Sequence, residues 1–338
     1  MYLYLVNHSN VFKGSFSDAL PRLPKTLTKP KLDAPKFPST LDGSLVPEPH
    51  NTRHALGVMI ENHPDARPQY GLSSASFVYE AIAEGGITRF LAIFGSHDAS
   101  KVGPVRSART YYADWCNEYD CYYAHVGGAQ DGLAKIRADK IKDLDQFANA
   151  KAYKREPRNN VATEHTMFSS TGKLYDLASN KKWGSALRED YGVFTFIDDP
   201  TSASTIAPTH PKISINFSAA PYAVSYDYDV TTNSYKRELA GTAHIDAENN
   251  QQIAPKNIII QHTARSKGED ERAWTMTTIG SGKAVIYQGG KKIDGTWKKT
   301  DKYSRTLFYD ANNDKISLYR GSTWIEVVNP GSVVTDTP

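Results

Sequence analysis

Two arginines stand near the start of a predicted helix, where elementary electrostatics favours the opposite charge. Gly103-Pro104 precedes Arg106 and Arg109. Proline is favoured in the first turn of a helix, so the pattern predicts a helix over residues 105–119. Because the start of a helix is partially positive, two arginines three positions apart on one face require an anion nearby.

The anion can come from outside the chain or from the chain itself. An external phosphate or carboxylate would accept hydrogen bonds from the guanidinium groups and from the free N–H groups of the helix start. Alternatively, Glu80 or Glu84 pairs with the arginines in a structural role. Arg89 favours the ligand, since it follows Gly85-Gly86, a glycine pair that allows close approach of a ligand as well as a turn.

Further polar residues follow predicted strands. Asn62 and His63 come after the apolar run 55–60, and His125 comes two residues before Gly127-Gly128. Clefts of open α/β sheets form at such strand ends. The alternative is that each histidine simply satisfies its hydrogen bonds within the fold.

The carboxylates and histidines do not match a known catalytic or metal-binding pattern. On a strand, Glu80 and Glu84 would lie about 13 Å apart, too far for a glycosidase pair. No HExxH, P-loop, GxSxG or EF-hand motif occurs. Some residues offer zinc ligands but follow no spacing rule, so we predict no metal site and no cofactor. These residues are Glu61, His63, His125, Glu164 and His165.

The composition is that of a globular protein. The 338 residues are 39% hydrophobic and 23% charged, with mean hydropathy −0.53. No apolar stretch reaches the roughly 18–20 residues of a membrane-spanning helix. A net charge of +3 does not favour a nucleic-acid partner, and we interpret the basic run 151–158 as a solvated loop.

The elements that must position these residues change in type along the chain. Residues 1–50 hold seven of the 18 prolines, which predicts an extended tether. Residues 51–205 predict an α/β domain with a mixed sheet and flanking helices, including a hairpin of strands 77–84 and 87–94 and helices over 129–138 and 166–180. A helix over 77–84 is the alternative to the first strand of the hairpin. Residues 206–338 show short runs typical of strands, which predict a smaller β-rich domain. These runs include 212–217, 223–229, 234–239, 257–262, 284–288 and 323–328.

Two cysteines are present, Cys116 and Cys121. Their spacing fits neither a CxxC redox pair nor a zinc knuckle, and we expect buried thiols. A disulfide is the alternative in an oxidising compartment, but a helix carrying the first residue and a strand carrying the second would place the Cα atoms outside bridging range.

Several motifs together resemble the YerB-like family of bacterial lipoprotein-type proteins, whose domains have no assigned function. The motifs are 58–63 (VMIENH), 66–69 (ARPQ), 71–73 (GLS), 78–80 (VYE), 84–90 (EGGITRF), 103–109 (GPVRSAR) and 125–128 (HVGG). The similarity continues more loosely through 155–169 and into 295–297 and 321–325.

The resemblance implies an α/β domain followed by a smaller domain, and an extracytoplasmic protein tethered by a lipid. This chain shows neither a signal peptide nor a lipobox cysteine. The family motifs contain the candidate ligand-binding residues, which are Asn62, His63, Arg67, Glu80, Glu84, Arg89, Arg106, Arg109 and His125.

The leading hypothesis is a cell-envelope protein that binds an anionic ligand, such as a phosphorylated glycan or cell-wall fragment, in a cleft ringed by Arg89, Arg106 and Arg109. One alternative is a hydrolase or transferase acting on envelope polymers, with His125 or Glu84 as general acid or base. A third is a protein-interaction scaffold that uses Trp297 and Trp324 as exposed contacts.

Overall fold

The computed structural model describes residues 34–184, 193–200, 208–268 and 274–337, and residues 35–338 form one compact unit. Residues 1–33, the larger part of the predicted tether, lie outside the described residues. The prediction of an α/β fold with a mixed sheet, flanking helices and a β-rich C-terminal part is confirmed.

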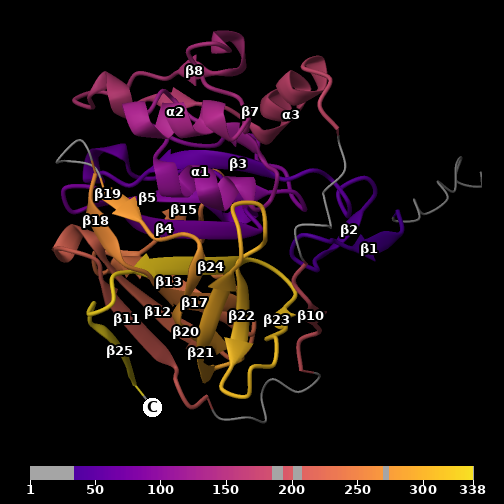
Figure 1. Ribbon diagram of the computed structural model, residues 1–338, viewed down its shortest axis with the longest axis vertical. Helices are drawn as coiled ribbons and strands as arrows, with labels where there is room; N and C mark the ends of the chain where they lie inside the picture. Colours follow the sequence, from indigo (N-terminus) through magenta and orange to yellow (C-terminus); the bar gives the residue numbers. More distant parts are fainter. Residues whose placement is uncertain (1–33, 185–192, 201–207, 269–273, 338) are drawn as a thin grey trace, which may run out of the picture. The chain divides into compact units, whose positions relative to one another are not determined.

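A sheet of ten described strands organises this unit (Figure 1). In spatial order its strands are β22 (Leu307–Asp310), β21 (Lys291–Lys299), β20 (Gly280–Gln288), β17 (Asn257–His262), β24 (Thr323–Val328), β4 (Phe77–Glu84), β5 (Ile87–Phe94), β3 (Leu56–Glu61), β6 (Tyr122–Ala124) and β7 (Lys142–Asp143).

The two predicted domains contribute to the same sheet. Strand β24 runs parallel to β4 on one side, with Glu326 opposite Glu80, and parallel to β17 on the other. Strands β4 and β5 form the predicted hairpin, which turns at Gly85-Gly86. The sheet is therefore continuous across residue 205, where the sequence changes from mixed to β-rich patterns.

Successive side chains of a strand point to opposite faces, and the core divides accordingly. Leu56, Val58 and Ile60 of β3 belong to one apolar cluster, whereas Met59 belongs to the other. The first cluster packs under helix α3 (Thr171–Asn180) and a second sheet. The second cluster packs under helix α1 (Thr110–Asn117), which Figure 1 shows in front of β4 and β5.

The second sheet has five described strands from the C-terminal part of the chain. In order they are β14 (Thr242–Ala243), β13 (Ser234–Leu239), β12 (Ala223–Asp229), β11 (Lys212–Asn216) and β25 (Val334–Thr337). Its alternating residues Val224 and Tyr226 are buried in the first cluster, so this sheet covers the large one.

Short elements complete the described part of the chain. Several strands form two-stranded pairs. They are β1 (Lys36–Pro38) with β2 (Leu45–Pro47), β8 (Lys154–Arg155) with β9 (Met167–Phe168), and β10 (Phe196–Ile197) with β23 (Leu318–Tyr319). Two more pairs are β15 (Ile245–Asp246) with β16 (Gln251–Gln252) and β18 (Arg265–Lys267) with β19 (Trp274–Met276). The 3-10 turns are η1 (Pro64–Ala66), η2 (Leu72–Ser74), η3 (Ala150–Ala152), η4 (Thr163–His165) and η6 (Ala220–Tyr222).

The helix predicted over 105–119 is shorter, and the prediction was wrong at its start. The backbone N–H groups of Val105, Arg106 and Ala108 donate to Met167, Met59 and Gly127 of other segments. These bonds hold the chain extended until the N-cap residue Arg109. Helix α2 (Gln130–Ala138) agrees with the prediction over 129–138, whereas α3 begins five residues later than predicted, since 167–168 pair as β9.

Residues 36–50 are part of the compact unit, which corrects the prediction that the tether extends to residue 50. Leu41 and Val46 are buried, and the Asp42 carboxylate accepts a hydrogen bond from Ser96 at 2.7 Å. Proline-rich composition did not prevent this segment from packing, because its few apolar side chains reach the core.

The expectation of two free thiols was also wrong. Cys116 and Cys121 form a disulfide, with Cα atoms 5.4 Å apart. The helix ends at Asn117, and the N–H of Cys121 bonds back to the carbonyl of Cys116. This tight reversal brings the two residues within bridging range.

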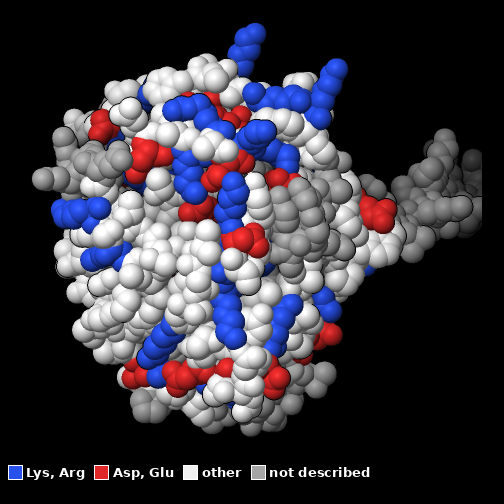
Figure 2. Space-filling view, in the orientation of Figure 1, with Lys and Arg blue, Asp and Glu red and all other residues white. Residues whose placement is uncertain are grey.

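Trp297 and Trp324 are buried, not exposed, so the scaffold hypothesis loses its motivating observation. Among the described residues, no helix has the length and apolarity needed to cross a membrane. Figure 2 shows Lys and Arg mixed with Asp and Glu over the face drawn, without a continuous basic surface on it.

Candidate functional site

A buried carboxylate, Glu61, lies where β3 ends. Its Oε1 accepts hydrogen bonds from the N–H groups of Asn62 and His63, both at 3.2 Å. Its Oε2 faces the guanidinium of Arg106, and Nδ1 of His165 lies 3.6 Å away. Burial alone would raise the pKa of Glu61, but His165 and the charges of nearby arginines hold it well below its usual range. Glu61 is thus an anion that organises its neighbours.

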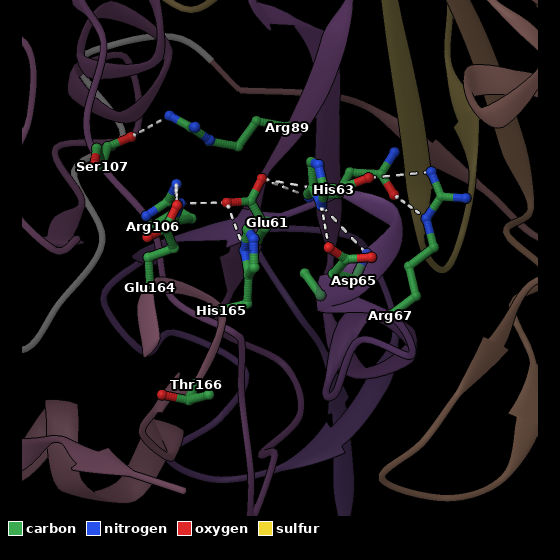
Figure 3. Close-up of polar contacts among 12 residues, drawn as sticks. Glu61, His63, Asp65, Arg67, Arg89, Arg106, Ser107, Glu164, His165 and Thr166 are labelled. Atoms are coloured by element: carbon green, nitrogen blue, oxygen red, sulfur yellow. Dashed lines mark hydrogen bonds and ion pairs between the residues drawn. The ribbon is translucent and has the colours of Figure 1, made fainter. Parts of the chain in front are cut away.

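Arg106 lies between this carboxylate and the solvent. Its side chain is 20% exposed, pairs with Glu61, and places Nη2 3.8 Å from Glu164. Figure 3 shows the guanidinium between these two carboxylates. Because Arg106 lies in an extended segment and not on a helix, it does not share a helical face with Arg109.

Two histidines and an aspartate gather on the other side of Glu61 (Figure 3). The rings of His63 and His165 stack with centroids 4.8 Å apart and planes 8° apart. Nδ1 of His63 accepts the N–H of Asp65 at 3.2 Å, and lies 3.7 Å from the Asp65 carboxylate. This group combines imidazole nitrogens with a carboxylate at the edge of the buried site.

The other two predicted arginines are occupied by Glu84. Arg89 and Arg109 donate to its two oxygens at 3.0 and 2.5 Å. Arg89 also donates to the carbonyl of Ser107 at 2.9 Å, and both arginines are buried. These contacts agree with the alternative in which Glu84 supplies the anion and the arginines are structural.

Three further candidates belong to a separate buried network. Asn62 donates to Glu80 at 3.2 Å and to Thr88 at 2.7 Å, and its Oδ1 accepts from Arg67 at 3.2 Å. Arg67 also donates to the carbonyl of Pro221 at 2.7 Å. These side chains link the large sheet to the five-stranded sheet.

Residues that the sequence analysis did not identify complete this network. Arg237 of β13, fully buried, pairs with Glu80 and lies 3.9 Å from Glu326. Burial, and then the charge of Glu80, raise the pKa of Glu326. Burial and the charge of Arg237 lower the pKa of His244, so its ring is neutral. Its Nδ1 accepts a hydrogen bond from Arg237, and its Nε2 donates one to the side-chain oxygen of Gln69 at 3.0 Å.

His125 has both ring nitrogens engaged. Nδ1 lies 2.8 Å from the carbonyl of Gly127, and Nε2 lies 3.1 Å from the carboxylate of Asp143. The ring is fully buried. His125 therefore orients the turn at Gly127-Gly128, and neither it nor Glu84 offers a free group for the general acid or base role considered from the sequence.

A cavity of about 430 Å³ opens beside Arg106. Ser107, Gly127 and Gly128 form part of its wall, and α2 begins two residues after Gly128. Arg155 and the aromatic ring of Phe147, which is 74% exposed, also face it. The remaining lining residues are Val126, Leu133, Asp145, Glu164 and Met167.

The nine predicted residues therefore do not form one cleft. Arg106 lines the cavity, His63 lies at the edge of the Glu61 group, and the others are engaged in buried contacts. Sequence reasoning missed Asp65 and Arg155. The first follows His63 by two positions, a short-range signal, whereas the second lies in a run interpreted as a solvated loop.

Comparisons with known proteins agree with this architecture. The family model for the N-terminal domain of "Protein of unknown function (DUF3048)" matches residues 41–184, and that for the DUF3048 C-terminal domain matches residues 213–325. A Bacillus subtilis (strain 168) protein named "Putative lipoprotein YerB" is 29% identical over 300 residues, which cover 87% of each chain.

The crystal structure of the YerB protein from Bacillus subtilis superposes with a TM-score of 0.77 at 25% identity, and covers 89% of this chain and 100% of that one. The resemblance found in the sequence motifs is thus confirmed: this chain belongs to the YerB-like family, built from the two DUF3048 domains of unknown function.

Proposed function

We propose that the protein binds an anionic ligand, such as a phosphorylated glycan or cell-wall fragment, in the cavity beside Arg106. The observation that carries this proposal is the pair of guanidinium groups, from Arg106 and Arg155, that line one cavity of about 430 Å³. This volume lies within the range of small-molecule sites, and planar guanidinium groups suit bidentate contacts with phosphate or carboxylate.

The start of α2 lies beside the cavity, and its first turn carries one carboxylate, Asp131. Its N-cap residue, Ala129, makes no side-chain capping bond, and it directly follows the lining residue Gly128. N–H groups at a helix start favour an anion. The buried Arg89 supports this wall indirectly, since it donates to the carbonyl of Ser107, which also lines the cavity.

The remaining lining suits the uncharged part of a glycan. The exposed ring of Phe147 offers an apolar surface for a sugar face, and the carboxylate of Glu164 is an acceptor for hydroxyl groups. Asp145 is less available, because its Oδ1 accepts the N–H of Gly127 at 2.8 Å. The proposed ligand therefore combines one anionic group with a hydroxyl-bearing ring.

We place this activity outside the cytoplasmic membrane, with the natural protein tethered by a lipid. The relative's name, lipoprotein, supports this location. The disulfide between Cys116 and Cys121 supports it independently, since disulfides persist mainly in oxidising compartments.

A thermal-shift screen tests the proposal. The probes are inorganic phosphate, a glucose phosphate, glycerol-phosphate oligomers and muropeptides, each added to the purified chain. A ligand at 100 times its dissociation constant adds about 2.7 kcal/mol, enough to raise the unfolding midpoint by several degrees.

Arg155→Gln is the informative variant, since Arg155 is exposed and its side chain donates a hydrogen bond to the carbonyl of Thr163. We expect it to fold normally and to lose the shift. Arg137→Gln is the matched control, because Arg137 is also exposed but does not line the cavity. The absence of a shift with every probe, or an equal loss in both variants, contradicts the proposal.

A further inference from the structure

We propose that His63, Asp65 and His165 form a binding site for a divalent transition-metal ion of the zinc class. The sequence analysis predicted no metal site, because its candidate ligands follow no spacing rule. The fold supplies what the spacing lacks: one potential ligand atom from each of these three residues, all within 4.8 Å of one another. The proposal does not depend on the anionic ligand.

Two separate segments build the group, and each is held in place. His63 caps η1 directly after β3, with Nδ1 accepting the N–H of Asp65. His165 ends η4, which carries it from the far side of the site against the first histidine. Figure 3 shows the two rings and the Asp65 carboxylate around one small region next to Glu61.

His165 is the buried member of the group. Its side chain is 7% exposed, and its Nδ1 makes no hydrogen bond of normal length among the described residues, since its neighbour, the Glu61 carboxylate, is 3.6 Å away. Buried polar groups are nearly always paired, because an unpaired one loses its hydration without compensation.

Glu61 is placed to orient the ring of His165. Its Oε2 lies 3.6 Å from Nδ1, so coordination through Nε2 would direct an Nδ1–H toward this carboxylate. Metal-ligating histidines usually donate their other ring N–H to a carboxylate or carbonyl, which fixes the tautomer and ring orientation. No polar contact of Nε2 is present among the described residues.

The donor set selects the class of metal. Two imidazole nitrogens and one carboxylate suit zinc and neighbouring transition metals, whereas magnesium and calcium prefer oxygen ligands alone. Three protein ligands leave a position for water or for a ligand oxygen. Closing the group around an ion requires His63 and Asp65, which are 33% and 62% exposed, to move closer to His165, and the ion would replace the hydrogen bond that Nδ1 of His63 accepts from the N–H of Asp65.

The test is calorimetric titration of untagged, EDTA-treated and dialysed protein with Zn²⁺, Mn²⁺ and Mg²⁺ in phosphate-free buffer. We expect one Zn²⁺ per chain with a dissociation constant in the micromolar range or below, and much weaker binding of Mg²⁺. Co²⁺ provides a second readout, since visible absorption bands are expected when it binds nitrogen and oxygen ligands in a tetrahedral site.

Three variants locate the ion. His63→Ala and Asp65→Asn replace partly exposed side chains, so both should fold, and each should weaken Zn²⁺ binding at least about tenfold. His97→Ala is the matched control, because His97 is exposed and remote in sequence from the three ligands. His165→Ala is informative only alongside these, since its buried ring also contributes to packing.

The outcomes separate this site from the anion site. Arg155→Gln should keep its Zn²⁺ affinity, because Arg155 is not among the three ligands. Absence of stoichiometric Zn²⁺ binding in the unmodified protein overturns the proposal, as does binding that His63→Ala and Asp65→Asn leave unchanged. Neither result bears on the phosphate or glycan screen.

Discussion

Replacing Arg237 by methionine should destabilise the protein more than most single substitutions. The guanidinium is fully buried between Glu80 and Glu326, which are also fully buried. Its Nε donates to the hydroxyl of Tyr226 at 3.1 Å, and its Cζ lies 4.4 Å from the ring centre of Trp324. Methionine retains much of the packing volume but leaves Glu80 without its cation.

The expected loss follows from these contacts. Removing one partner of a buried ion pair costs about 3–5 kcal/mol, since the remaining charge is uncompensated. Glu80 keeps its hydrogen bonds from Asn62 and Thr88, which reduces this cost. The lost bond to Tyr226 adds about 1 kcal/mol. We therefore expect a loss of about 4 kcal/mol, a large part of the roughly 5–15 kcal/mol typical of a folded protein.

Urea unfolding at pH 7, followed by the fluorescence of the five tryptophans, measures this loss. The double variant Arg237→Met, Glu80→Gln should recover at least half of it, because no unpaired charge remains, and it stays measurable if the single variant does not fold. Lys236→Met is the matched control, since Lys236 is half exposed on the same strand. A loss below about 1 kcal/mol for Arg237→Met, or an equal loss in the double variant, refutes the reasoning.

Two further predictions concern other buried contacts. Burial alone would raise the pKa of Glu84, but the charges of Arg89 and Arg109 outweigh it and hold the pKa below its usual value. The stabilisation of the fold by ionised Glu84 is therefore complete above the unfolded pKa of about 4.3 and is lost as the pH falls further. The unfolding free energies of the native protein and of Glu84→Gln should converge below that pH. A difference that stays constant with pH contradicts this prediction. Gly57→Ala should cost about 1–3 kcal/mol in the same urea assay, because its Cβ would lie 2.7 Å from both sulfur atoms of the disulfide; an unchanged midpoint contradicts this.

Several strands of the C-terminal part were predictable from the sequence. The bounds of β12, β13, β17 and β24 agree with the runs seen in the sequence, and the β4–β5 hairpin turns at the predicted glycine pair. Burial alternates over part of β12 and β13, as a period of two residues predicts, whereas β17 and β24 are buried at nearly every position because both faces of the large sheet are covered. Local patterns also sufficed for α2, whose start follows a glycine pair.

Long-range pairing was not predictable in the same way. The parallel contact of β24 with β4 joins residues more than two hundred positions apart, and no local pattern encodes that choice of neighbour. The same limit explains the error at Arg106. Proline after glycine resembles a helix start, but hydrogen bonds to Met59 and Met167 from distant segments hold this chain extended.

The candidate site was predictable in its residue types but not in its grouping. Arg106 was identified from its position near the start of a predicted helix and His63 from its position after a predicted strand, and Glu164 and His165 were identified as possible zinc ligands without a spacing rule. Arg237 was missed because it comes from a β-rich region in which single charges look like ordinary surface residues. Only the packing of one sheet on the other makes that charge buried and paired.

Burial divides the dense polar motifs of this family into two roles. Side chains that are fully enclosed, such as Glu80 and Arg89, have partners for their charges within the fold, and their replacement should change stability first. Side chains that keep a face to solvent, such as Arg106 and His63, have room for one more partner. An external ligand can interact strongly only with the second kind, because displacing a buried partner would expose an uncompensated charge. The edge of the sheet around Glu61, where the second kind gathers, is therefore the part of this molecule at which binding and stability can be measured separately.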